Sequence, residues 1–140
     1  MKSARLIVAL LMVLPGLAAA QLASDRIIVA QVPFEFVVAN KIIPAGQCVL
    51  KKATMDGNTL AVRNAGSNVT LFSWASRVET KETAGAYTLV FNRQGDQYFL
   101  RGIKLEGSRM TYRLPESKAE AELRARNVPA SEEIVLASLK

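Results

Sequence analysis

The residue types that most often carry out catalysis or bind transition metals are scarce in this chain. Its 140 residues include no histidine, and Cys48 is the one cysteine. A Ser–His–Asp triad, a Cys–His pair and a nitrogen- or sulfur-rich zinc or iron site all need these residues, so the sequence excludes all three. It also contains no glycine-rich phosphate loop and no calcium loop of alternating acidic residues. We therefore expect no cofactor and no metal ion.

Carboxylates are the remaining side chains that could carry out acid–base chemistry, as the carboxylate pair of a glycoside hydrolase does. The acidic residues available for such a pair are Glu35, Asp56, Glu79, Glu82, Asp96 and Glu106. Most of them fall in predicted turns or loops, and their spacing pairs no two of them. An enzyme that uses carboxylates alone is therefore the third interpretation of the sequence, and we expect a protein that is not an enzyme.

Four residues are candidates for contact with a ligand or a partner. Trp74, the only tryptophan, could line a pocket for a ring-bearing ligand, but a single aromatic residue at strand spacing is more often part of a core. Arg93 and Asp96 flank a predicted turn, where we expect them to lie opposite each other as a solvated charge pair. Arg101 lies on the more polar face of the strand that follows.

A hairpin within residues 86–105 is the clearest structural element. Two runs rich in β-branched and aromatic residues, 87–92 and 97–103, flank a turn in which Gly95 supplies a positive φ. With Gln94 and Gly95 as the loop, Phe91 faces Tyr98 across the ladder. The face predicted to be core carries Tyr87, Leu89, Phe91, Tyr98 and Leu100. The opposite face, predicted to be wetted, carries Thr88, Val90, Asn92, Gln97, Phe99 and Arg101.

The rest of the chain alternates apolar and polar residues in short runs between turn signals. We predict further strands over residues 32–39, 47–53, 60–63, 69–78, 110–114 and 133–139. Cys48 is expected to point inward and to behave as a small hydrophobe. The residues that share one face of the run 69–78 are Thr70, Phe72, Trp74, Ser76 and Val78. Ser117 and Glu120 form a capping box, which predicts one short helix near residues 117–127.

These elements indicate a mainly β fold. We expect an antiparallel β-sandwich or a small, partly open barrel of about eight strands, with one short C-terminal helix. Residues 1–20 are predicted to be a signal peptide, because basic residues precede an apolar run that is too short to span a membrane. Small residues then provide a cleavage site after Ala20, with Ala23 as the alternative. Residues 21–31 are expected to be a flexible leader, and residues 32–140 a single β domain.

The signal peptide predicts an exported protein, in the periplasm or outside the cell, with no transmembrane helix once the peptide is removed. The basic residues of the chain are spread along its length. The formal net charge of +6 falls to +4 when Lys2 and Arg5 leave with the signal peptide. This distribution gives no indication of nucleic-acid binding.

Three segments resemble an uncharacterised family of small exported bacterial proteins. The segments are VPFEFVVANKIIPAG (32–46), LVFNRQGDQYFL (89–100) and SKAEAEL (117–123). They are similar to the family's Pro-Phe-x-Phe strand, Pro-Ala-Gly turn, Gly-Asp-x-Tyr-Phe-Leu hairpin and charged Ala/Glu helix. The resemblance implies export and a mostly β domain with a helix near its end, and it implies no activity. The chain differs at Cys48, where the family often has tyrosine, and at Asn92, where histidine is common.

Several functions are consistent with this sequence. The leading interpretation is an exported cell-envelope protein of unknown function, acting as a non-catalytic structural or protein-interaction module with an unknown protein or envelope partner. The alternative is a carrier or binder of a small apolar ligand inside a β-barrel. An outer-membrane barrel fits less well, because several runs are shorter than the roughly 9–11 residues of its strands. The bulky side chains predicted for the core favour a filled interior, and hence the first interpretation.

Overall fold

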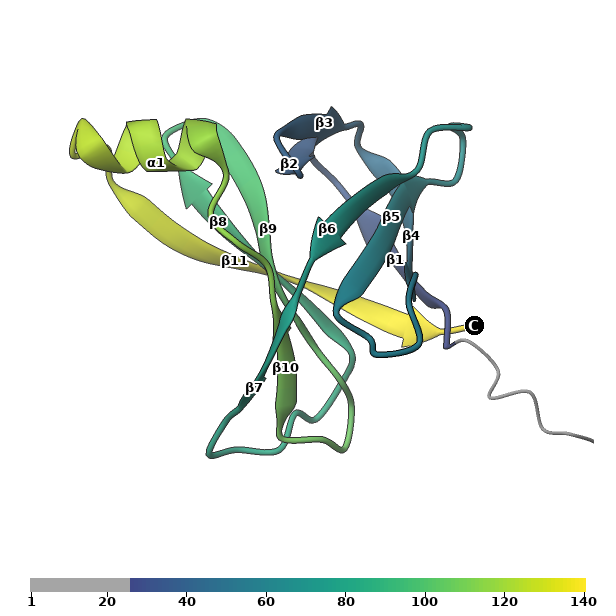
Figure 1. Ribbon diagram of the computed structural model, residues 1–140. Helices are drawn as coiled ribbons and strands as arrows, with labels where there is room; N and C mark the ends of the chain where they lie inside the picture. Colours follow the sequence, from purple (N-terminus) through teal and green to yellow (C-terminus); the bar gives the residue numbers. More distant parts are fainter. Residues whose placement is uncertain (1–25) are drawn as a thin grey trace, which may run out of the picture.

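The computed structural model describes residues 26–140 and has a mainly β fold (Figure 1). The predicted signal peptide lies outside the described residues. The strands are β1 (Ile28–Val32), β2 (Phe36–Val38), β3 (Lys41–Ile43), β4 (Gly46–Lys52), β5 (Thr59–Asn64), β6 (Leu71–Trp74), β7 (Ser76–Glu79), β8 (Thr88–Gln94), β9 (Gln97–Lys104), β10 (Met110–Arg113) and β11 (Ala130–Leu139). One short helix, α1 (Lys118–Ala125), precedes the last strand.

The strands form a continuous sheet in the order β3-β2-β9-β8-β11-β1-β4-β5-β6, and β10 joins β9 to β7. The long strand β11 crosses the molecule and connects the two halves, since residues 130–136 pair with β8 and residues 137–139 pair with β1 (Figure 1). We call β1, β4, β5 and β6 the first half-sheet, and β2, β3, β7, β8, β9 and β10 the second half-sheet. The sheet is barrel-shaped and nearly closed, so the predicted partly open barrel is confirmed.

One predicted strand is divided in two by Pro33. Proline has no N–H to donate to a ladder, so β1 ends immediately before it and β2 begins three residues after it. β1 begins at Ile28, within the segment predicted to be a flexible leader, and it lies between β4 and β11. That part of the leader prediction is wrong, because Ile28, Ala30 and Val32 alternate toward the interior and are all buried.

The predicted hairpin is confirmed as β8 and β9, but its register differs from the prediction. The loop is Gly95-Asp96, so Phe91 faces Leu100 and Arg93 faces Tyr98. The observed register is two residues away from the predicted one. Because side chains in a strand alternate with a period of two, this shift leaves the predicted core face inward, and Phe91 and Leu100 are buried.

A β-bulge changes the second part of the hairpin. Phe91 pairs with Leu100, but the preceding residue, Val90, pairs with Gly102, which leaves Arg101 as the extra residue of β9. The bulge allows both Leu100 and Ile103 to point inward.

Phe99 corrects the prediction of a wetted outer face on this hairpin. It is buried although it lies on that face. The start of α1 and the strand β2 cover it, since Phe99 pairs with Val37 and shares a small pocket with Ser117 and Glu120.

The predicted capping box of α1 is confirmed. The Glu120 backbone N–H donates to the Ser117 hydroxyl, and the Ser117 backbone N–H donates to the Glu120 carboxylate. The Lys118 N–H donates to Asn40 Oδ1 at 2.8 Å, which joins the start of the helix to the turn between β2 and β3. Asn127, with a φ of 58°, lies just beyond the helix and turns the chain toward β11.

The core lies between the two half-sheets and is filled by aliphatic and aromatic side chains. Phe91 is at its centre, with the rings of Phe34 and Phe36 packed edge-on against it at centroid distances of 5.0 and 5.1 Å. The predicted inward orientation of Cys48 is confirmed, because the residue is buried. Burial raises the pKa of its thiol to about 12, because the apolar surroundings disfavour the thiolate.

Candidate functional site

Strand β6 presents two exposed aromatic side chains, Phe72 and Trp74. These residues are 60% and 61% exposed, whereas Ser73 between them is buried. The prediction that Trp74 belongs to the core is therefore wrong. The predicted strand 69–78 is also divided at Ala75, where the chain passes from the first to the second half-sheet.

The hydrogen bonds of β6 determine which of its backbone groups are available. The Ala75 N–H donates to the Asn58 carbonyl at 2.7 Å, and β5 and β6 pair antiparallel in that same register. Hydrogen-bonded and non-hydrogen-bonded pairs alternate along such a ladder. The backbone N–H and C=O groups of Phe72 and Trp74 therefore point away from β5.

The outer edge of β6 is unpaired but not fully open. In the described part of the chain β6 pairs with β5 alone. Strand β2 passes close to this edge without forming a ladder with it, and a pocket of about 40 Å³ lies between Ser73 and Val38. The Ser73 hydroxyl donates to the Trp74 carbonyl at 3.1 Å. The exposed side chains of β6 are thus a more accessible surface than its backbone edge.

Basic residues accompany the two aromatic rings on the outer face of the first half-sheet. Lys51 of β4 pairs with Ala61 of β5, which pairs with Phe72, so these three residues form one row across the sheet. Arg63 lies two residues beyond Ala61 on the same face and is exposed. We call Phe72, Trp74, Lys51 and Arg63 the aromatic–basic face.

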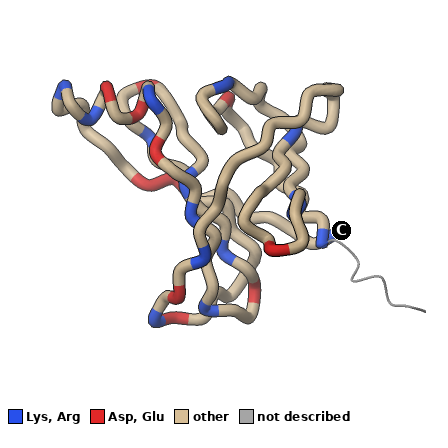
Figure 2. The backbone as a smooth tube through the Cα atoms, viewed as in Figure 1, with Lys and Arg blue, Asp and Glu red and all other residues tan. Residues whose placement is uncertain are grey.

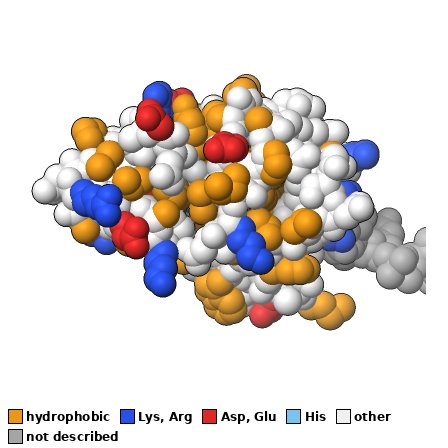
Figure 3. All heavy atoms as spheres, turned by 90° about the horizontal axis from the view of Figure 1, so that it is seen from above, with side chains coloured by type: hydrophobic (Ala, Val, Ile, Leu, Met, Phe, Trp, Pro, Cys, Tyr) orange, Lys and Arg blue, Asp and Glu red, His pale blue; other side chains and the backbone are white. Residues whose placement is uncertain are grey.

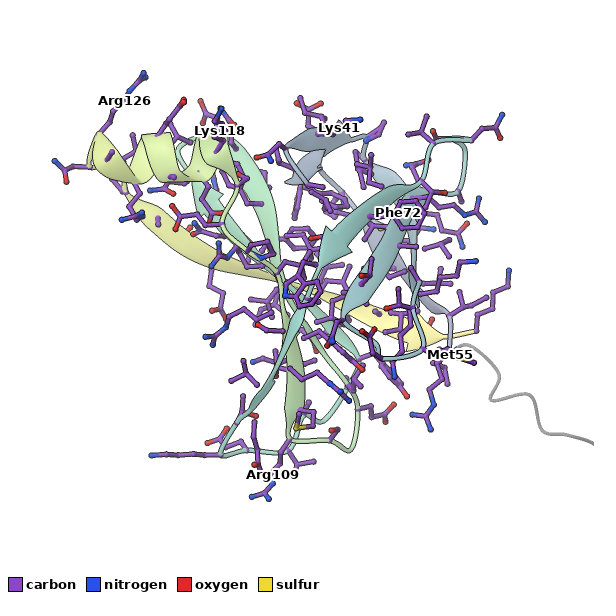
Figure 4. All side chains as sticks on the ribbon, in the orientation of Figure 1. Lys41, Met55, Phe72, Arg109, Lys118 and Arg126 are labelled. Carbon is purple, nitrogen blue, oxygen red and sulfur yellow. The ribbon has the colours of Figure 1, made fainter. Side chains whose placement is uncertain are left out.

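The charged residues in the strands of the first half-sheet are all basic. Its four strands contain Lys51, Lys52 and Arg63 and no acidic residue. The acidic positions lie mainly on the second half-sheet, α1, β11 and the connecting loops (Figure 2). Figure 4 shows Phe72 beside β6, and Figure 3 shows apolar side chains at the surface between separated charged ones.

Arg93 and Asp96 do not lie opposite each other, because the hairpin register pairs Arg93 with Tyr98. The Arg93 guanidinium lies over the Tyr98 ring, 5.6 Å from its centroid, and Phe34 stacks on the same ring at a centroid distance of 3.7 Å. Asp96 instead lines a pocket of about 230 Å³ together with Glu35. The structure therefore assigns Arg93 to hairpin stability.

Arg101 lies in a polar network beneath α1. Its guanidinium donates to the Glu120 carboxylate at 3.2 Å, and Asn92 donates to the same carboxylate at 2.7 Å. Glu120 is only 4% exposed. A polar cleft of about 540 Å³ adjoins the network, with Arg124 and Glu116 paired across it at 3.0 Å. Each of these charged groups already has a partner, so the network fastens the helix to the hairpin.

Phe72, Arg63 and Lys51 are not among the site residues predicted from the sequence. In the run 69–78 both alternating faces contain apolar residues, so the pattern alone does not show which face is buried. Alternation along the strand places Phe72 on the same face as Trp74, but only the pairing of β6 with β5 brings Arg63 near them. Among residues 26–140 no three acidic or cysteine side chains are grouped closely enough to hold a metal ion.

No known family, no curated protein and no solved structure matches the chain. Within residues 26–140 the single helix is too short and too polar to cross a bilayer.

Proposed function

We propose that the protein is a non-catalytic interaction module of the bacterial cell envelope, and that its aromatic–basic face binds an acidic surface of a partner protein. The observation that carries this proposal is the exposure of Phe72 and Trp74 side by side on β6. Export to the envelope rests on the predicted signal peptide and on the resemblance to exported bacterial proteins.

The energetic argument begins with the aromatic rings. Burying one aromatic side chain removes roughly 150–250 Å² of surface from water, and tryptophan and arginine are the residues that most often dominate binding energies at interfaces. Trp74 lies on the same face as Phe72, and Arg63 lies diagonally across from Phe72. These positions would therefore give an interface an aromatic centre and a basic rim.

The charge pattern determines the chemistry of the partner. Lys51 and Arg63 flank the aromatic rings, and the four strands of this half-sheet contain no acidic residue. An acidic partner surface gains favourable encounters with such a face, while a basic one is repelled. We therefore expect binding to weaken as the salt concentration rises.

A non-catalytic role is supported by the contacts of the buried carboxylate. Glu120 is the one buried acidic residue in the described range, and Arg101 and Asn92 occupy its oxygens. These two donors and the Ser117 N–H give the carboxylate a structural role, which is to fix the helix to the hairpin.

Site-specific photo-crosslinking in the native host tests the proposed function. A benzoylphenylalanine in place of Phe72 should crosslink to one defined protein through an acidic segment, and the crosslink should be lost with Arg63→Glu. The same probe at Leu136, which is exposed on β11 where that strand pairs with β8, is the matched control and should not capture that protein. Crosslinking to lipid or glycan, or a crosslink unaffected by Arg63→Glu, would contradict the proposal.

A further inference from the structure

A second feature lies at the end of the barrel, beside the aromatic–basic face, with which it shares Lys51. A cavity of about 120 Å³ opens there between the two half-sheets. Its walls are apolar and come from both halves: Ile28, Leu50 and Leu60 from the first, and Ile103, Leu105 and Tyr112 from the second half-sheet and its adjoining loop. Most of these side chains also belong to the hydrophobic core, so the cavity is continuous with the barrel interior.

The rim of this cavity is basic. Arg26, Lys51 and Lys52 line it, and no acidic residue does. The Lys52 ammonium lies over the Tyr112 ring, 5.7 Å from its centroid, at the cavity mouth. Within residues 26–140 neither Lys51 nor Lys52 forms an ion pair.

The register of β4 explains why a lysine is present on the inward face. Lys52 pairs with Leu60, so it follows Cys48 and Leu50 on the face that points into the barrel. The next turn packs along its aliphatic stem, since a Cβ placed on Gly57 would be 3.6 Å from the Lys52 side chain. The stem is therefore held against the protein while the ammonium remains at the mouth.

Asp56, in the turn that follows β4, does not line this cavity. Its carboxylate accepts hydrogen bonds from the Thr54 hydroxyl and from the backbone and side chain of Asn58. All three of these hydrogen bonds lie within the turn itself.

We propose that this cavity binds a small organic anion with an apolar group about the size of a benzene ring and a carboxylate that reaches the rim. The size follows from the volume, since an apolar cavity of about 150 Å³ accepts benzene. The charge follows from the basic residues at the mouth, where Lys52 lies on the inward face and a carboxylate can accept a charge-assisted hydrogen bond from its ammonium. The cavity shares Lys51 with the proposed partner surface, but the ligand proposal does not rest on that surface.

Nuclear magnetic resonance titration with phenylacetate tests the proposal, with phenylacetamide as the uncharged compound of equal size. Phenylacetate should shift the backbone amide signals of Lys52, Ile103 and Leu105 in a saturable way. The loss of the charge-assisted contact should weaken binding about tenfold, both for phenylacetamide and for the Lys52→Met variant. Lys81→Met, at an exposed lysine that does not line this cavity, is the control and should bind as the unchanged protein does.

A second variant tests the apolar part of the site. Leu105 is half-buried, so Leu105→Trp can fill the cavity from its edge with little effect on the core, and it should abolish the titration. Circular dichroism of the Lys52→Met and Leu105→Trp variants checks that they are folded. Equal affinity for phenylacetate and phenylacetamide, binding that survives Leu105→Trp, or the absence of saturable shifts at millimolar ligand would overturn the proposal. None of these results depends on the partner surface, because Phe72 and Arg63 are unchanged.

Discussion

The Asn92 side-chain amide donates to the buried Glu120 carboxylate at 2.7 Å, across 28 positions of sequence. This contact joins the first strand of the hairpin to the helix. The same carboxylate accepts from Arg101 and from the Ser117 N–H, so one side chain both caps the helix and fastens it to the sheet.

Removal of the Glu120 carboxylate should therefore be costly. Glu120→Ala leaves Asn92 and Arg101 without their acceptor and removes half of the capping box, so we expect a loss of about 2–4 kcal/mol in the free energy of unfolding. Urea denaturation followed by circular dichroism measures it. Glu122→Ala, at an exposed position of the same helix, should change stability by less than about 0.5 kcal/mol. Equal effects of the two substitutions would show that the network does not hold the helix.

Because the Cys48 thiol is buried, we expect the folded protein to lose stability at alkaline pH. The thiol has a pKa near its ordinary value of 9.0 when the chain is unfolded and about 12 when it is folded. Between these values the unfolded chain loses a proton that the folded chain keeps, so ionisation favours unfolding and stability falls as the pH rises above about 9. We expect Cys48→Val, which keeps the residue apolar, to have a shallower decline between pH 8 and 10. Parallel curves for the two proteins would contradict this assignment.

The same burial should make Cys48 unreactive in the folded protein. A neutral, inaccessible thiol does not attack a disulfide reagent, so we expect labelling at pH 8 only at the rate of unfolding, and rapid labelling in denaturant. Rapid labelling of the native protein would show that the thiol is accessible.

The exposure of Trp74 can be measured directly because it is the only tryptophan. Its fluorescence emission should lie close to that of free tryptophan and shift little on unfolding. The basic residues of the aromatic–basic face should concentrate anions, so iodide should quench the emission more strongly than caesium does. Arg63→Glu should reduce this difference. A blue-shifted emission maximum in the native protein would place the ring in the interior instead.

Alanine substitutions at two glycines distinguish the energetic cost of backbone strain from that of side-chain crowding. Gly95 and Gly107 both have positive φ, of 63° and 73°, but a Cβ at Gly95 would lie 3.3 Å from Val128 Cγ1, while Gly107 has open space around it. Substitution by alanine should cost about 1 kcal/mol at Gly107 and about 1–2 kcal/mol at Gly95. Gly85→Ala, at a position with neither feature, should be nearly neutral. Thermal unfolding of the three variants provides the comparison.

The elements of this fold that depend on nearby residues could be predicted from the sequence. The capping box predicts the helix because Ser117 and Glu120 are three residues apart, and the hairpin is predicted because both of its strands adjoin one turn. The inward position of Cys48 follows from its alternation with Leu50. Each of these signals lies within a few residues of the structure that it predicts.

Features that depend on distant pairing could not be predicted in this way. The role of β1 requires both β4 and the last strand as neighbours, and nothing near Ile28 indicates them. The exposure of Trp74 depends on which face β5 leaves outside. Arg101 pairs with a residue 19 positions away, across a bulge that the alternation of β9 does not show.

The position of β11 between β8 and β1 has a consequence for how the chain folds. Every other strand of the barrel precedes β11 in the sequence, yet both half-sheets depend on it for their connection. During synthesis from the N-terminus, β1 and β8 each keep an unpaired edge until β11 emerges. Local hairpins such as β8-β9 can form earlier, but the two half-sheets join only through contacts between distant parts of the chain, which is typical of slow folding.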